Sequence, residues 1–360
     1  MGITRKEVAK SLQKLVRRQG WWRKVRILLT GVGCPGAHAL ITNLKKQEPD
    51  IFILGTNATE QAIGKWICDD FAIVPWAYEK GYVDSIIDLV RQHNIDIVFP
   101  QTSWEMFHLS KASTTIEKYC KLLASKHEYV NICENKFLMY EHFKGKIEVP
   151  EYYLVRTFEE LEKAALKLGY PDKDIVFKPP EGKGARGVRV MTEKSDRYDL
   201  LFNGRPFAKF ISMDELKNTV SGKEIPELMI MEYLDGEELK IDPVVQKGEM
   251  LVCSVKLRMN FASGLGMNYE FIDDKKAIKY AEKVMEYLPM DYCVDISTRG
   301  GVLMEINPRV STYIYSDNYC PPYLSLKLAM GEMGKNEIQK YQSNIPIGKR
   351  LFRYYGQVDY

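Results

Sequence analysis

Apolar runs alternate with helix-like stretches over residues 25–99, and this alternation constrains the fold more than any other feature of the sequence. A β-prone run at Val25–Thr30 precedes a glycine-rich turn and a helix-like stretch that ends near Lys46. Further strands are expected at Ile51–Leu54, Phe71–Val74 and Asp96–Phe99, with a helix near Val83–His93. Strands that alternate with helices form parallel sheets, because each crossover connection needs a helix. This part is therefore predicted to be a doubly wound parallel sheet with helices on both faces.

The pattern changes after about Cys133, where strand candidates come as hairpin-like pairs. The pairs are Ile175–Lys178 with Val188–Met191, Ile241–Val245 with Leu251–Leu257, and Tyr292–Ser297 with Val302–Ile306. Connections such as Gln246–Gly248 and Thr298–Gly301 carry the glycines that tight turns favour. The second part is therefore predicted to be an α+β fold rich in antiparallel strands.

Size and composition exclude several classes of protein. The chain has 360 residues, which suits two or three lobes, and its 45% hydrophobic and 28% charged residues are typical of a globular protein. A net charge of +3 gives no basis for nucleic acid binding. No apolar run reaches the ~18–20 residues of a membrane span, and seven scattered cysteines without a C-x-x-C pair indicate reduced thiols. We expect a soluble, cytoplasmic protein that binds no nucleic acid.

Residues 1–24 combine basic side chains with apolar residues at helical spacing, and no apolar core of a signal peptide is present. This basic helix could dock on its own protein or on a membrane surface or partner. The sequence leaves both interpretations open.

The loop Gly31–Gly36 follows a strand and precedes a helix, with glycines spaced as in a dinucleotide-binding fingerprint. That fingerprint also needs a carboxylate at the end of the second strand, where this chain has Leu54–Asn57 instead. Pro35 removes one amide donor from the loop. A structural turn explains the glycines equally well, and an NAD(P) site is kept as an alternative.

The segment from Asp174 to Val188 delivers a lysine, Lys178, at the end of an apolar strand, followed by a loop with three glycines. Glycines let backbone amides approach phosphate oxygens, and Lys183 and Arg186 add positive charge. The loop is not a Walker A sequence. It is either a phosphate-binding loop or a solvated basic hairpin.

The segment Leu228–Leu239 is an apolar strand that ends at Glu232 and runs into an acidic turn. Such a segment could present main-chain groups to a nucleotide base and a carboxylate to a ribose. An exposed acidic hairpin would have the same sequence pattern.

The strongest local signal is Tyr292–Arg309. Asp295 lies on one face of its strand, and Glu305 and Asn307 share one face of the returning strand. Across a hairpin these three side chains could converge as hard oxygen ligands, the type that Mg²⁺ prefers. A carboxylate inside the apolar run Val302–Ile306 is costly unless it is paired or bound to a metal. The segment therefore predicts a metal site, with a salt bridge as the alternative.

In this order the three segments resemble the ATP-grasp superfamily, in particular single-chain ligases related to half of the carbamoyl-phosphate synthetase large subunit and to the pyrrolysine-biosynthesis ligase. The resemblance runs from about Val25 to about Gly331 and is most specific at Met304–Arg309. Phe177–Pro179 and Met231–Leu234 occur in the expected order. The chain departs from the family in the short segment between the first two metal ligands, and after Arg309 it lacks the serine-rich run of true carbamoyl-phosphate synthetases.

The resemblance implies a nucleotide site and four segments of the chain. The ATP-binding residues would be Lys136 and Lys178 on the phosphates, Lys183, Gly184, Arg186 and Gly187 in a closing loop, Glu232, Tyr233 and Leu234 at adenine, and Glu238 at ribose. The segments would be a basic helix (1–24), an α/β domain (25–132), an ATP-grasp lid subdomain (133–232) and a C-terminal subdomain with the metal site (233–360).

The resemblance also implies a reaction. Asp295, Glu305 and Asn307 would hold Mg²⁺ or Mn²⁺, while Arg258 and Arg309 would steady the γ-phosphate and an acyl-phosphate. A carboxylate, from an amino acid or small acid, would be activated by ATP and then attacked by an amine or a thiol. A nucleotide-binding regulatory protein and an NAD(P)-dependent oxidoreductase remain the alternatives, and a homo-oligomer is left open.

Overall fold

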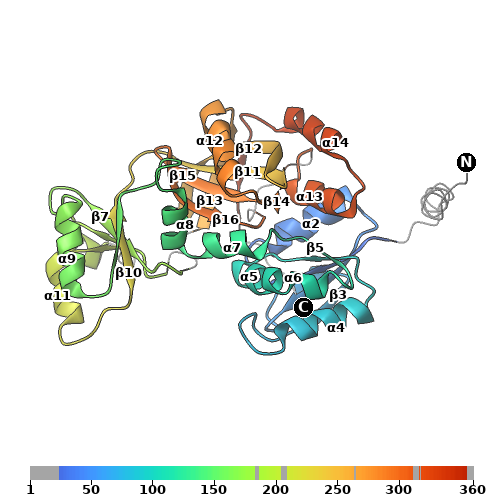
Figure 1. Cartoon of the computed structure of the whole chain (residues 1–360), viewed down its shortest axis with the longest axis horizontal. Coiled ribbons are helices and arrows are strands. Elements are labelled where there is room, and N and C mark those ends of the chain that lie inside the picture. Colours follow the sequence, from blue (N-terminus) through green and yellow to red (C-terminus); the bar gives the residue numbers. More distant parts are fainter. Residues whose placement is uncertain are drawn as a thin grey trace, which may run out of the picture.

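The computed structural model describes residues 24–182, 186–203, 209–262, 265–310, 316 and 318–354 (Figure 1). The predicted basic helix, apart from Lys24, lies outside this range, and so do Lys183 and Gly184. The described residues form three sheets. One sheet with its helices makes a separate lobe at the left of Figure 1, while the other two sheets lie close together.

The first sheet is parallel and has the strand order β3-β2-β1-β4-β5. Its strands are β1 (Arg26–Leu29), β2 (Phe52–Asn57), β3 (Asp70–Ile73), β4 (Ile97–Phe99) and β5 (Lys121–Leu122). Its helices are α2 (Ala37–Gln47), α3 (Gly64–Ile67), α4 (Tyr82–Gln92), α5 (Ser103–Lys111) and α6 (Ser113–Ile116).

Helices cover both faces of this sheet because its central strand is apolar on both sides. Ile27 and Leu29 pack into one core with α2, whereas Leu28 packs into another with α4. A strand buried on both faces reads as a continuous apolar run, the pattern by which β1 was predicted. The doubly wound parallel sheet is thus confirmed.

The glycine-rich loop after β1 is a tightly packed turn. Gly31 has a φ of +62°, and a Cβ atom there would lie 2.6 Å from the Thr102 methyl group. The Gly33 amide donates to Asn57 Oδ1 at 3.1 Å, where a dinucleotide site would need a carboxylate. The packing explains these glycines without a bound dinucleotide.

The second sheet has the order β6-β10-β7-β8-β9 and is antiparallel except between β8 and β9. Its strands are β6 (Tyr152–Val155), β7 (Ile175–Lys178), β8 (Arg189–Met191), β9 (Phe210–Ile211) and β10 (Leu228–Glu232). The helices α9 (Phe158–Lys167) and α11 (Met213–Val220) pack on one face, with α10 (Arg197–Phe202) nearby in the chain (Figure 1).

The third sheet has the order β16-β15-β11-β12-β13-β17, and β14 also pairs with β11. Its strands are β11 (Glu238–Gln246), β12 (Glu249–Ala262), β13 (Leu265–Ile272), β14 (Tyr292–Cys293), β15 (Asp295–Arg299), β16 (Val302–Asn307) and β17 (Arg350–Phe352). One core joins it to α12 (Lys275–Tyr287), α8 (Lys136–Phe143) and the preceding α7 (His127–Glu134).

The last helices of the chain pack near the first sheet, which together with its helices is called the first lobe below. These are α13 (Pro321–Met330), α14 (Lys335–Gln339) and the 3-10 helix η1 (Lys340–Asn344). In α13, Leu326 and Ala329 belong to the core of the first sheet, whereas Leu324 and Leu328 belong to a core on β12 and β13. The helix therefore holds the first and third sheets together.

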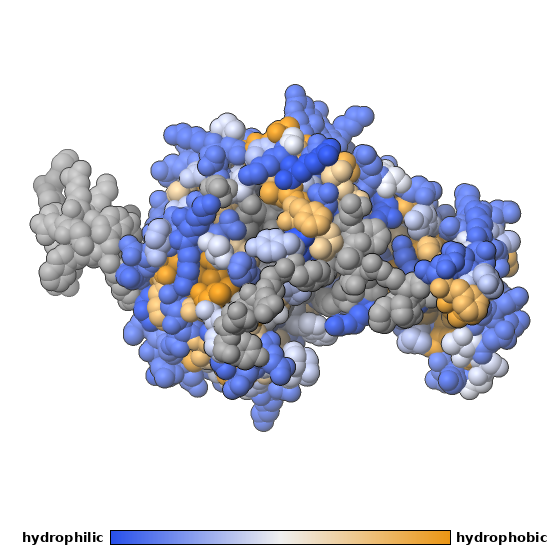
Figure 2. All heavy atoms as spheres, turned by 180° about the vertical axis from the view of Figure 1, so that it is seen from behind, coloured by the Kyte–Doolittle hydropathy of each residue, from blue (hydrophilic) through white to orange (hydrophobic). Residues whose placement is uncertain are grey.

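The three predicted hairpins are confirmed, and so is the α+β character of the second part. The second strand was predicted to end at Leu54, but it continues to Asn57 because Gly55–Asn57 pair with β3. No helix among the described residues is long and apolar enough to cross a membrane. Seen from behind, the described surface is largely hydrophilic, with apolar side chains in small scattered groups (Figure 2).

Candidate functional site

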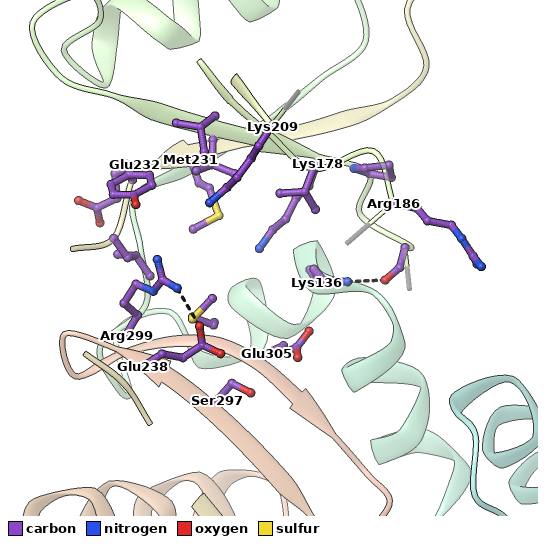
Figure 3. A pocket seen from close by; sticks show the side chains of 18 of the residues that line it. Lys136, Lys178, Arg186, Lys209, Met231, Glu232, Glu238, Ser297, Arg299 and Glu305 are labelled. Carbon is purple, nitrogen blue, oxygen red and sulfur yellow. Dashed lines mark hydrogen bonds and ion pairs between the residues drawn. The ribbon is translucent and has the colours of Figure 1, made fainter. Parts of the chain in front are cut away.

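A cavity of about 260 Å³ lies between the second and third sheets (Figure 3). Six of its lining residues carry cationic side chains and three carry carboxylates. The cations are Lys136, Lys178, Arg186, Lys209, Arg258 and Arg299, and the carboxylates are Glu232, Glu238 and Glu305. The excess of positive charge suits an anionic ligand.

Lys178 lies at the end of β7, as its place after an apolar run predicted, and its side chain is buried. Its Nζ donates to the Tyr140 hydroxyl at 3.4 Å, and that hydroxyl donates to the Met304 carbonyl at 2.8 Å. Burial, helped by the charge of Lys136 and opposed by Glu305, lowers the pKa of Lys178 from 10.5 to about 7. A buried ammonium group of this kind is stabilised by an incoming anion.

The start of α8 is fastened to the loop that follows β7. The Lys136 amide donates to the Pro180 carbonyl at 2.9 Å, and Lys136 Nζ donates to the Gly182 carbonyl at 2.9 Å. Asn135 caps α8 by accepting from two backbone amides, and its Nδ2 donates to Glu181 at 3.0 Å. Two lysines from separate elements therefore reach one cavity, and burial lowers the pKa of Lys136 as well.

Asn135→Ala should reduce the free energy of unfolding by about 1 kcal/mol, the usual cost of losing a helix cap. It should also weaken the binding of an anionic ligand in the cavity, because the tether to Glu181 is lost. Denaturant unfolding and calorimetric titration with inorganic triphosphate measure the two effects. Thr157→Ala, which removes the cap of α9 away from the cavity lining, is the matched control. If both variants bind triphosphate like the wild type, the tether has no role in binding.

The described part of the predicted phosphate loop consists of Gly182, Arg186 and Gly187. Arg186 lines the cavity, although Figure 3 shows its side chain directed away from the other labelled side chains. Gly187 has a φ of +74°, and a Cβ there would lie 2.9 Å from the ring of Pro179. Only glycine fits this position without strain.

Apolar side chains from the second and third sheets line one part of the cavity, here called the apolar slot. It is lined by Val176, Val188, Val190, Met231, Leu234 and Met304, together with Tyr233. At its edge, Glu232 exchanges two hydrogen bonds with Glu151. The Glu232 amide donates to the Glu151 carbonyl at 3.0 Å, and Glu232 Oε1 accepts from the Glu151 amide at 2.8 Å.

Glu238 is held by two arginines that lie opposite it on neighbouring strands. Arg258 Nη1 donates to its Oε1 at 2.5 Å, and Arg299 Nη2 donates to its Oε2 at 2.7 Å. Burial alone would raise the pKa of Glu238, but the two guanidinium groups lower it. The structure thus places Arg258 beside the residue predicted for ribose, and it adds Arg299, which was not predicted.

The three residues predicted to bind a metal do converge. In the β15–β16 hairpin Asp295 lies opposite Asn307, and Ser297 lies opposite Glu305. Asn307 Nδ2 donates to Asp295 Oδ2 at 3.4 Å and to Glu305 Oε1 at 3.3 Å. Their oxygens are the hard donors that suit Mg²⁺, which usually takes one or two carboxylates and completes its shell with phosphates and water.

A lysine that was not predicted lies inside this cluster. Lys240 Nζ is 3.3 Å from Asp295 Oδ1 and 3.6 Å from Glu305 Oε1, and it also donates to the Ser297 hydroxyl. Burial would raise the pKa of Glu305, but Lys240, Lys136 and Lys178 lower it to about 2. Within the described ranges no group of three or more Asp, Glu, His or Cys is arranged to hold a metal ion. Two carboxylates with Asn307 still fit a cation that also binds phosphate.

Two signals in the sequence could have revealed the missed residues. Lys240 is two residues after Glu238, and Arg299 is two residues after Ser297, so each shares a strand face with a residue of the site. Lys209 lies outside any recognised motif, and only the fold brings it to the cavity.

Arg309 links this cluster to the first lobe. Its Nε donates to Ser103 Oγ, at the start of α5, at 3.1 Å, and its Nη2 donates to Asn307 Oδ1 at 3.3 Å. The carboxyl edge of the parallel sheet, where α/β proteins commonly bind ligands, therefore adjoins the end of β16.

Two family models match the chain. Residues 27–123 match the model described as the PylC-like N-terminal domain. Residues 224–348 match the model described as ATP-grasp in the biosynthetic pathway with Ter operon, which includes the hairpin with Glu305 and Asn307. The chain thus combines a PylC-like N-terminal domain with an ATP-grasp segment. The predicted recognition, as an ATP-grasp enzyme related to the pyrrolysine-biosynthesis ligase, is thereby confirmed.

Solved structures share the fold of this chain at low sequence identity. A carboxyaminoimidazole ribonucleotide synthase from Aspergillus clavatus, complexed with ATP, is 15% identical with a TM-score of 0.64, covering 88% of this chain and 79% of that one. The biotin carboxylase domain of a Hydrogenobacter thermophilus 2-oxoglutarate carboxylase, in complex with MgADP, is 12% identical with a TM-score of 0.64, covering 91% and 74%. A phosphoribosylglycinamide synthetase from Anaerococcus prevotii is 15% identical with a TM-score of 0.60, covering 91% and 80%.

Proposed function

We propose that the chain binds Mg-ATP in this cavity and joins a carboxylate to an amine, with release of ADP and phosphate. The observation that carries the proposal is the convergence of Lys136, Lys178 and Glu305 on one cavity (Figure 3). These residues come from α8, β7 and β16, so the fold alone assembles two cations and a carboxylate at one place. An apolar slot next to a cationic end matches the shape and charge of a nucleotide.

We assign adenine to the slot beside Met231, Tyr233 and Leu234. Because the Glu232 amide is used within the sheet, Glu232 would contact the base through its carbonyl oxygen. Glu238 would accept from the ribose hydroxyls, and its arginine partners fix its orientation. Lys136 and Lys178 would hold the phosphates, and the loop of Lys183, Gly184, Arg186 and Gly187 would cover them.

The divalent ion belongs to the other end of the cavity. Glu305 and Asn307, with Asp295 as the third predicted ligand, would hold Mg²⁺ or Mn²⁺, which neutralises negative charge on the phosphates. The carboxylate of the substrate attacks the γ-phosphorus, ADP leaves, and an acyl-phosphate forms. The amine then attacks the acyl carbon, and inorganic phosphate leaves with the two electrons of the broken C–O bond.

The residues of this chain act by positioning and by neutralising charge. Arg309 would steady the acyl-phosphate from its place between Ser103 and Asn307, and this position lets the first lobe contribute to the substrate site. We also assign Arg258 to the phosphate-transfer step, in which it would act from beside Glu238. The carboxylate is proposed to be an amino acid or another small acid, and a thiol acceptor is the variant of the same chemistry.

Phosphate release from Mg-ATP tests this proposal, with amino acids and small carboxylates supplied singly and in pairs with amines or thiols. We expect release of ADP and phosphate only with particular substrates. ATP binding without turnover on any pair would favour a regulatory nucleotide-binding protein. Failure to bind ATP would overturn the assignment, and NAD(P) binding detected by cofactor fluorescence would favour the oxidoreductase.

A further inference from the structure

The two carboxylates of the metal cluster differ in their access to the cavity. Glu305 lines the cavity, and its side chain is 41% exposed. The side chain of Asp295 is 6% exposed and lies against Lys240, which is 11% exposed. Glu305 can meet a ligand from the cavity, whereas Asp295 is covered.

Lys240 already neutralises Asp295. Its ammonium group contacts Asp295 Oδ1 at 3.3 Å and Oδ2 at 3.4 Å, and it also contacts the Ser297 hydroxyl, while Glu305 Oε1 lies farther away at 3.6 Å. A divalent ion bound by Asp295 would have to lie next to this ammonium group, at a cost in repulsion.

We propose that Lys240 is a built-in cation of the metal cluster, so that the site takes a single divalent ion through Glu305 and Asn307. Asp295 is then a positioning residue that holds Lys240 rather than a metal ligand. This inference rests on the proposed function, because it concerns the ion that accompanies the nucleotide. It explains why Lys240 of β11 lies against the carboxylates of Asp295 and Glu305.

The neighbouring ion pair offers a matched comparison. Lys256 lies directly opposite Lys240 on β12, and its Nζ is 2.7 Å from Asp242 Oδ2. Both side chains are almost completely buried, and neither lines the nucleotide cavity. Asp242→Asn and Asp295→Asn therefore each weaken the pairing of one buried lysine, but only the second touches the metal cluster.

The test counts Mn²⁺ ions by electron paramagnetic resonance, with a non-hydrolysable ATP analogue bound to the full chain. The wild type should bind one Mn²⁺ per chain, and Lys240→Met should bind two. Asp295→Asn should bind one, with an affinity within about threefold of the Asp242→Asn control, whereas Glu305→Gln should weaken binding at least tenfold. Two ions in the wild type, or equal losses in Asp295→Asn and Glu305→Gln, would overturn the proposal.

A double variant covers the case in which Asp295→Asn does not fold. Lys240→Met with Asp295→Leu removes the whole buried pair, a replacement that proteins often tolerate. It should still bind Mn²⁺ through Glu305, and loss of binding in a folded double variant would contradict the proposal. Calorimetry with the ATP analogue distinguishes failure of this inference from failure of the proposed function. If the wild type binds the nucleotide together with two Mn²⁺ ions, only the role of Lys240 is overturned. If the wild type does not bind the nucleotide, the proposed function is overturned.

Discussion

Glu305→Gln should lower the rate of ATP-dependent phosphate release by about 10²–10³-fold, the usual effect of removing one group that stabilises charge in a transition state. Glu305 faces the cavity and stays ionised down to acidic pH, because Lys240, Lys136 and Lys178 lower its pKa to about 2 although its partial desolvation opposes this. Glutamine keeps the shape of the side chain and removes only the negative charge. The measurement is phosphate release with the substrate pair identified for the wild type.

The free energy of unfolding of this variant should also depend less on pH in the acid range. The pKa of Glu305 falls from 4.5 to about 2 on folding, so its charge stabilises the folded state above about pH 4.5. This contribution is lost as the pH falls from 4.5 towards 2, and Glu305→Gln should show less of that loss. Glu270→Gln, on β13 and paired with Arg350 of the edge strand β17, is the control for removing a carboxylate from the same sheet. Wild-type turnover in Glu305→Gln would contradict the metal assignment.

ATP should bind about tenfold more weakly at pH 8.5 than at pH 7.5, because Lys178 has a pKa of about 7 in the free protein. The phosphates favour the charged ammonium group, so binding takes up a proton when Lys178 is neutral beforehand. Calorimetric titrations in two buffers with different heats of ionisation measure this uptake. Lys178→Arg stays charged at every relevant pH and should bind ATP without it.

Rising pH has the opposite effect on the free energy of unfolding, which should increase while ATP binding weakens. The pKa of Lys178 is about 7 when folded and 10.5 in its usual environment, so the unfolded chain binds more protons between these values. The cost of burying this lysine therefore falls as the pH rises from 7 to 10.5, while nucleotide binding weakens. Absence of proton uptake by the wild type near pH 8 would show that Lys178 does not meet the phosphates.

The sequence was informative where one physical rule decides the structure. The strands with continuous apolar runs were found because burial on both faces demands them, and the pairing of Asp295 with Asn307 follows from the two-residue period of a hairpin. The two- and three-residue strands β9 and β17 are too short to show such a pattern, because tertiary pairing rather than composition forms them.

The charged part of the site was harder to predict. A lysine such as Lys240 in a strand is normally read as exposed, and only the neighbouring strands β15 and β16 bury it with Asp295 and Glu305. In the same way, Arg258 was assigned by resemblance to the phosphates, but the register of β11 with β12 sets it against Glu238. Pairwise partners of buried charges depend on register and sheet order, which one sequence does not specify.

The position of α13 has a consequence for building chimaeras with other ATP-grasp proteins. Leu326 and Ala329 complete the core of the first lobe from more than 200 residues beyond its last strand, which ends at Leu122, and Lys327 is paired with Glu48. An exchange of the first lobe alone would therefore leave a foreign helix against its core. The first lobe and α13 form one unit of exchange, although the chain separates them, and substrate specificity should be transplanted between relatives with both pieces together.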